Sequence, residues 1–214
     1  MRNYTVPSPY YNDVGSGNFC SLVGSSYSSI ISDKETPLRL SLIFERTDYS
    51  PSCFGMVSTL ETEREIVITR RSNEMGCFRN QLGCFSGALP FGTSNVEKWA
   101  ENRVRRESNH GPYMELAGIC DDNVTGCSVL SYRGSVDVLE NLPRNLYDER
   151  GVLKYSEIFK VEKRDLPKFI EDNKRDLVST LDPLLSYVAM MEKGKGSLKS
   201  FVRKMNAEKL RTRK

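Results

Sequence analysis

Hydrophobic and polar residues alternate with a period of two along much of the first two thirds of the chain. After Pro37, leucine or phenylalanine occupies every second position from Leu38 to Phe44, a pattern typical of a half-buried strand. Shorter segments of the same kind predict strands at 56–60, 64–70, 113–119, 127–132 and 135–139. Gly, Asn and Asp separate these segments, which favours an antiparallel sheet or sandwich over βαβ units.

One helix interrupts the predicted strands. Ser94 followed by Glu97 fits a capping box at its start. Its apolar face carries Val96, Trp99, Ala100 and Val104. Its end carries the basic residues Arg103, Arg105 and Arg106, as the helix dipole prefers.

The strand signal ends near Leu142, and helical spacing takes over. Asp165 and Pro167 can open a helix, and apolar residues then recur every three or four positions as far as Met191. Gly194-Lys195-Gly196 breaks this pattern, and Ser197 can cap a last, amphipathic helix. We therefore predict an α+β fold, with a mostly antiparallel β core followed by a C-terminal helical region.

Composition divides the chain into four parts. Residues 1–36 form a flexible arm rich in Ser, Gly and Tyr, residues 37–141 the β-rich core with its one inserted helix, 142–193 the helical region, and 194–214 a basic amphipathic tail. With 214 residues and 38% hydrophobic residues, the chain can bury a real core. It has no apolar run of the roughly 20 residues that cross a bilayer and no secretory signal. We expect an intracellular protein, cytoplasmic or nuclear, with its six cysteines reduced.

Charge is concentrated at the C-terminal end. The last 23 residues carry nine Lys or Arg against two Glu, whereas the whole chain has a net charge of only +3. Such a tail binds polyanions by releasing counterions, without sequence specificity. We predict contact with nucleic acid, RNA above all, through Lys195, Lys199, Arg203, Lys204, Lys209, Arg211, Arg213 and Lys214, widened by Arg103, Arg105 and Arg106. An anionic membrane surface is the alternative partner, with no transmembrane segment, and self-association into a homo-oligomer is a further expectation.

The cysteines have a repeated spacing. Six residues separate Cys77 from Cys84 and Cys120 from Cys127, and a glycine precedes the second cysteine of each pair. Four thiolates from two hairpins can hold zinc. Structural zinc sites, however, place paired cysteines two to four residues apart, so we expect no cofactor and keep zinc as the alternative.

A second alternative is catalysis by a cysteine. Ser52-Cys53-Phe54 precedes His110, the only histidine, and a thiolate paired with an imidazolium is the pairing that thiol proteases use. The segment resembles the cysteine–aromatic signature of papain-like proteases, including short viral leader proteases. This resemblance implies Cys53 as nucleophile and His110 as base.

The sequence contains no phosphate-binding glycine loop, and a single histidine excludes multi-histidine metal sites. We therefore predict a non-enzymatic binding protein, with a β core that makes protein–protein contacts and a basic tail that contacts RNA. Small viral matrix, movement or silencing-suppressor proteins have this general layout. The alternatives are the cysteine protease and a peripheral, matrix-like membrane protein.

Overall fold

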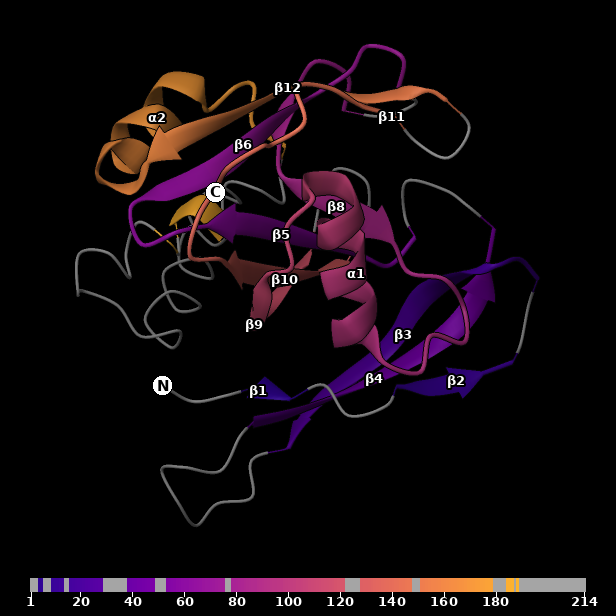
Figure 1. The fold of residues 1–214 in the computed structure, drawn as a ribbon. Helices are drawn as coiled ribbons and strands as arrows, with labels where there is room; N and C mark the ends of the chain where they lie inside the picture. Colours follow the sequence, from indigo (N-terminus) through magenta and orange to yellow (C-terminus); the bar gives the residue numbers. More distant parts are fainter. Residues whose placement is uncertain are drawn as a thin grey trace, which may run out of the picture.

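A computed structural model describes residues 4–5, 9–13, 16–28, 38–48, 53–75, 78–121, 128–147, 151–178, 184–186 and 188. Figure 1 shows two sheets, with one long helix in front of the larger. The strands are β1 (Tyr4–Thr5), β2 (Tyr10–Asn12), β3 (Phe19–Ser28), β4 (Leu38–Thr47), β5 (Gly55–Glu61), β6 (Glu65–Arg71), β7 (Leu82–Gly83), β8 (Phe85–Ala88), β9 (Tyr113–Asp121), β10 (Ser128–Ser135), β11 (Leu146–Tyr147) and β12 (Leu153–Glu162). The helices are α1 (Val96–Ser108), the short 3-10 helix η1 (Lys163–Asp165) and α2 (Leu166–Asn173).

The larger sheet has the order β11-β12-β6-β5-β10-β9, and β7 and β8 pair with β6 and β5. Its central strands are rich in β-branched residues, and every residue of β5 is buried. The β5–β10 pair is parallel, and the other pairs of this sheet are antiparallel. The predicted α+β class is confirmed.

Two apolar clusters cover the two faces of this sheet. On one face, Val96, Ala100 and Val104 of α1 pack into a cluster that includes Met56 and Leu60 of β5. On the other face, a second cluster contains Leu166 of α2, the helical residues Leu184, Leu185 and Val188, and sheet residues such as Ile66 and Ile68. The sheet is therefore the middle layer between α1 and the C-terminal helical segments.

Helix α1 lies where its apolar spacing predicts it. The cap is Asn95, one residue later than expected, and its side chain accepts a hydrogen bond from Lys98 N at 2.8 Å. The helix ends at Asn109, which has a left-handed φ of 62°. This start and end fix the direction in which the last turn of α1 meets the sheet.

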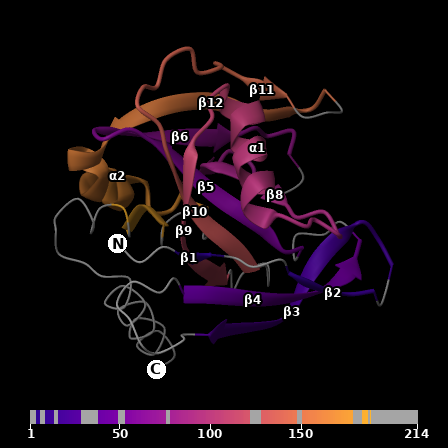
Figure 2. The same ribbon diagram turned by 60° about the horizontal axis from the view of Figure 1, so that its bottom comes forward.

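The flexible arm predicted for residues 1–36 is wrong for the part that the structure describes. β3 pairs along its length with β4, and β2 pairs with β4 on the other side. Figure 2 shows this smaller sheet beneath the larger one. Backbone hydrogen bonds join the two sheets, from Phe54 N to Cys20 O at 2.8 Å and from Cys20 N to Leu89 O at 3.1 Å.

The C-terminal part also corrects the prediction. The 142–193 region is not purely helical, because β11 and β12 precede η1 and α2. A strand at 135–139 is wrong as well, since β10 ends at Ser135. Helix α2 is confirmed, with Pro167 in its first turn. The predicted basic tail, 194–214, lies outside the described residues. Within the residues that are described, no helix is long and apolar enough to span a membrane.

Candidate functional site

A cluster of buried charged side chains lies between the last turns of α1 and the sheet. Arg103 and Glu107 are four residues apart on α1, so they share one face of the helix. Lys154 and Tyr155 come from β12, and Arg71 from β6, where Arg71 is the register partner of Tyr155. We call these five residues the α1–β12 cluster.

Glu107 is the centre of this cluster. Lys154 Nζ donates to its Oε1 at 2.5 Å, and Tyr155 OH donates to its Oε2 at 3.2 Å. Arg103 Nε lies 2.6 Å from Oε1, but this buried nitrogen has no well-aligned hydrogen-bond acceptor among the described residues. Lys154 Nζ also donates to Ser86 O at 2.7 Å. Lys154 and Glu107 thus form a buried ion pair.

Positive charge exceeds negative charge in the cluster. Lys154 and Glu107 are each 5% exposed and Arg71 is 8% exposed. Two cationic side chains, Lys154 and Arg103, pair with the single carboxylate of Glu107. Burial lowers the pKa of Lys154 to about 8, with Arg103 and Arg71 adding to the decrease and Glu107 opposing it. Burial, and then Glu107, raise the pKa of Tyr155. An anion is the ligand that such a site favours.

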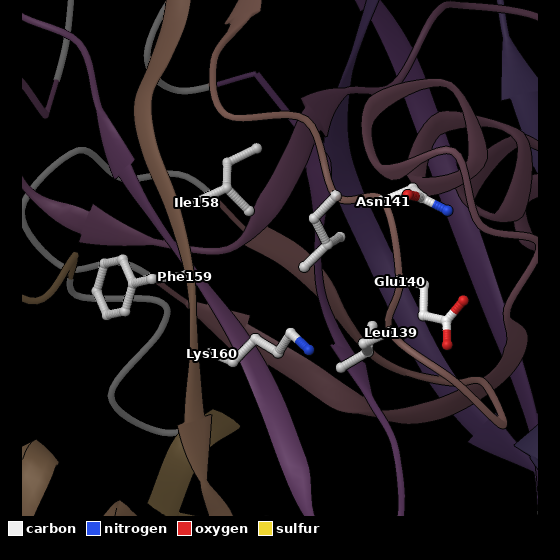
Figure 3. A pocket seen from close by; sticks show the side chains of 7 residues that line it. Leu139, Glu140, Asn141, Ile158, Phe159 and Lys160 are labelled. Atoms are coloured by element: carbon white, nitrogen blue, oxygen red, sulfur yellow. The ribbon is translucent and has the colours of Figure 1, made fainter.

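A pocket of about 630 Å³ opens further along β12 (Figure 3). Its lining residues are Leu139, Glu140, Asn141, Leu142, Ile158, Phe159 and Lys160. Ile158 and Tyr155 pack into the same apolar cluster, so the pocket and the α1–β12 cluster use one face of β12. Three positions along a strand span about 10 Å, within the length of one small molecule.

The predicted basic residues of the helix separate in the structure. Arg103 belongs to the α1–β12 cluster, whereas Arg105 is exposed and pairs with Glu101 at 2.6 Å. Arg106 is also exposed. The tail residues from Lys195 to Lys214 lie outside the described residues, and their contact with a polyanion stays a prediction.

Cys53 and His110 are not brought together. Cys53 precedes the first residue of β5 and lies 3.2 Å from Asp48 O through its Sγ. His110 follows α1, near the start of β9, which the strand register places beside the end of β5. The length of β5, about 20 Å, separates these two positions. The protease prediction is therefore wrong.

The zinc alternative stays a prediction. Cys84 is buried, and burial raises the pKa of its thiol. Cys120 is half-buried, and Cys77 and Cys127 lie outside the described residues. Where the structure describes the chain, no group of three or more His, Cys, Asp and Glu side chains is placed to hold a metal ion.

The described layers, a mixed sheet between α1 and the C-terminal helical segments, define an α+β fold with a charged cluster at one end of its long helix. No family model and no curated protein matches the sequence. Solved structures do match the fold. The MutT protein from Methanosarcina mazei Go1 is 13% identical, with a TM-score of 0.51 over 69% of this chain and 99% of that protein. A NUDIX hydrolase from Nitrosomonas europaea is 15% identical, with a TM-score of 0.48 over 84% of this chain and 95% of that chain.

These similarities concern the fold, and they correct the predicted function. The likeness to the MutT protein is the finding that contradicts the predicted non-enzymatic RNA binder, and it extends to the fold alone. The prediction of a non-enzymatic, RNA-binding or matrix-like viral protein is therefore wrong. That prediction depends on the positive charge of the tail, whereas the residues that the structure describes contain a second charged site, the α1–β12 cluster.

Proposed function

We propose that this chain is a hydrolase that acts on a phosphate-bearing small molecule at the α1–β12 cluster. Two observations support the proposal. The fold resembles that of a MutT protein, and proteins with similar structures are named NUDIX hydrolases. The observation that carries the proposal is the excess of buried positive charge around Glu107, because guanidinium and ammonium groups are the side chains that bind phosphate oxygens.

The geometry suggests a role for each group. Arg103 and Lys154 would contact the phosphate and stabilise the negative charge that develops on it in the transition state. Glu107, released from Lys154 by the incoming phosphate, would accept a proton from the attacking water. The water oxygen then bonds to phosphorus as the bond from phosphorus to the leaving oxygen breaks, and the leaving group departs as an anion or takes up a solvent proton. The pocket over β12 would hold the rest of the substrate.

A hydrolysis screen tests this proposal. The purified full chain is incubated with inorganic pyrophosphate and a panel of nucleotides and sugar phosphates, and the products are followed by phosphorus NMR. We expect at least one phosphate bond to be hydrolysed. Glu107→Gln should lower kcat about 100-fold, since a general base contributes 10²–10⁴-fold.

Glu101→Gln is the matched control, because Glu101 lies on the same helix but pairs with Lys98 and Arg105 at the surface. It should keep the wild-type rate. Equal rates in the wild type and Glu107→Gln, with Glu107→Gln folded, would show that the site lies elsewhere. An intracellular location remains part of the proposal, and the reduced thiols of the buried residues Cys20 and Cys84 support it. Cell fractionation is its test.

A further inference from the structure

We infer that the pocket over β12 binds an aliphatic chain that ends in a negatively charged group, with Lys160 as the partner of that group. The inference rests on the proposed function in one respect, because that function places the rest of the substrate in this pocket. It adds the chemistry of that part of the substrate, and its test requires no turnover. A carboxylate and a phosphate both carry the required charge.

The side of the pocket that faces β12 is aliphatic. Leu139 is 3% exposed, and Leu142 and Ile158 pack partly buried against the same apolar cluster. Figure 3 shows Leu139 on the side of the loop that faces Lys160, whereas exposed Glu140 and Asn141 point to the other side. The volume of about 630 Å³ lies within the roughly 300–1,000 Å³ of small-molecule sites. An apolar ligand can therefore cover aliphatic surface here, which the hydrophobic effect favours.

The lining favours an aliphatic chain over a nucleobase. Phe159 points away from the other labelled side chains in Figure 3. Its ring packs on Phe169 of α2, with the ring centroids 6.3 Å apart, in the cluster on the opposite face of the sheet. Among the described residues that line the pocket, no aromatic ring thus faces the space over β12. Unpaired bases are usually bound by stacking on aromatic rings, which this lining does not offer.

Lys160 supplies the positive charge of the pocket. It follows Ile158 by two positions on β12, so the two side chains share one face of the strand. In Figure 3 its ammonium group extends toward Leu139. Glu65 of β6 pairs with Lys160 at 3.5 Å, and the two side chains are 36% and 40% exposed. An exposed ion pair of this kind is weak, and an ammonium group has three donors, so the anionic end of a bound chain can engage Lys160.

Calorimetric titration of the full chain with octanoate, octyl phosphate and neutral octan-1-ol tests the inference. We expect at least one of the two octyl anions to bind one molecule per chain, with a Kd below about 1 mM. Octan-1-ol should bind about tenfold more weakly, because it lacks the charge-assisted contact. The comparison of octanoate with octyl phosphate identifies which charged group the site takes.

Two variants separate the contributions of charge and apolar surface. Lys160→Met should weaken binding of the octyl anion about tenfold and leave octan-1-ol unchanged, since methionine keeps the apolar contact. Leu142→Asn should weaken binding of all three octyl compounds. Lys168→Met, at an exposed position of α2, is the matched control and should bind like the wild type. Melting curves establish that each variant is folded.

Three results would overturn the inference: no binding of either octyl anion, equal affinity for the anions and octan-1-ol, or unchanged affinity of the anions in folded Lys160→Met. Octanoate has no phosphate bond, so its binding does not depend on turnover. Binding of octyl anions without hydrolysis of any phosphate compound would support the inference and contradict the proposed function. Hydrolysis that depends on Glu107, without binding of octyl anions, would do the reverse.

Discussion

Buried Lys154 should make the stability of the protein depend on pH in a defined direction. Its pKa falls from its ordinary value of 10.5 to about 8 in the folded protein. Below about pH 8 the lysine is protonated in both the folded and the unfolded state. Between the two pKa values, the unfolded chain binds a proton that the folded protein has released. Stability therefore rises with pH across this window.

The size of the effect follows from the pKa difference. Each pKa unit corresponds to about 1.4 kcal/mol, so two units between pH 8 and pH 10 give on the order of 3 kcal/mol. Arg103, Glu107, Arg71 and Tyr155 face the lysine, with Cys84 nearby. All of these remain in Lys154→Met. The difference between wild type and this variant therefore isolates the lysine.

The assay is urea unfolding of wild type and Lys154→Met at about pH 7 and about pH 10. The wild type should gain on the order of 3 kcal/mol relative to the variant over this interval. Lys98→Met, at an exposed position of α1, should follow the wild type at both pH values. Parallel pH profiles for wild type and Lys154→Met would refute the reasoning, since they would mean that the lysine titrates equally in both states.

Three further substitutions test other parts of the fold by urea unfolding. Glu61→Ala should cost about 3–5 kcal/mol, because buried Glu61 pairs with Arg133 at 2.5 Å and Lys163 at 2.9 Å and both cations would lose that partner; a loss below about 1 kcal/mol would contradict this. Asn95→Ala should cost about 1 kcal/mol through the lost cap of α1, and Asn95→Asp should restore it. Gly17→Ala should cost about 1–3 kcal/mol, since φ is 103° there and the new Cβ would clash with the backbone oxygen of Thr47; an unchanged unfolding midpoint would count against this geometry of the connection between β2 and β3.

Local sequence patterns predict where strands and helices lie better than they predict which strands pair with one another. The alternation from Leu38 to Phe44 locates β4, and the apolar face of residues 96–104 locates α1, because burial on one side imposes a period on the sequence. The sequence does not reveal β3, because its Ser- and Gly-rich residues offer little apolar area. Backbone pairing with β4 holds this strand in place instead. β12 is missed because a register shift between Tyr155 and Glu157 interrupts its alternation. The parallel pairing of β5 with β10 has no local signature at all.

The candidate site is even less visible in the sequence. Glu107 and Lys154 are 47 residues apart and belong to no motif of fixed spacing. The sequence indicates the charge of Arg103, but the difference between partly buried Arg103 and exposed Arg105 depends on which face of α1 meets the sheet. The basic charges of the tail are visible in the sequence because they lie close together along the chain. A buried ion pair becomes visible only when the fold brings its members together.

The pairing of β6 with β12 has a consequence for how the protein is made. Arg70 and Glu157, which bond across these strands at 2.9 Å, are 87 residues apart. While the ribosome is still synthesising the intervening segment, β6 has no β12 to pair with, and its apolar residues are exposed to other nascent chains. Distant pairings of this kind slow folding. The larger sheet therefore cannot be completed until β12 has left the ribosome.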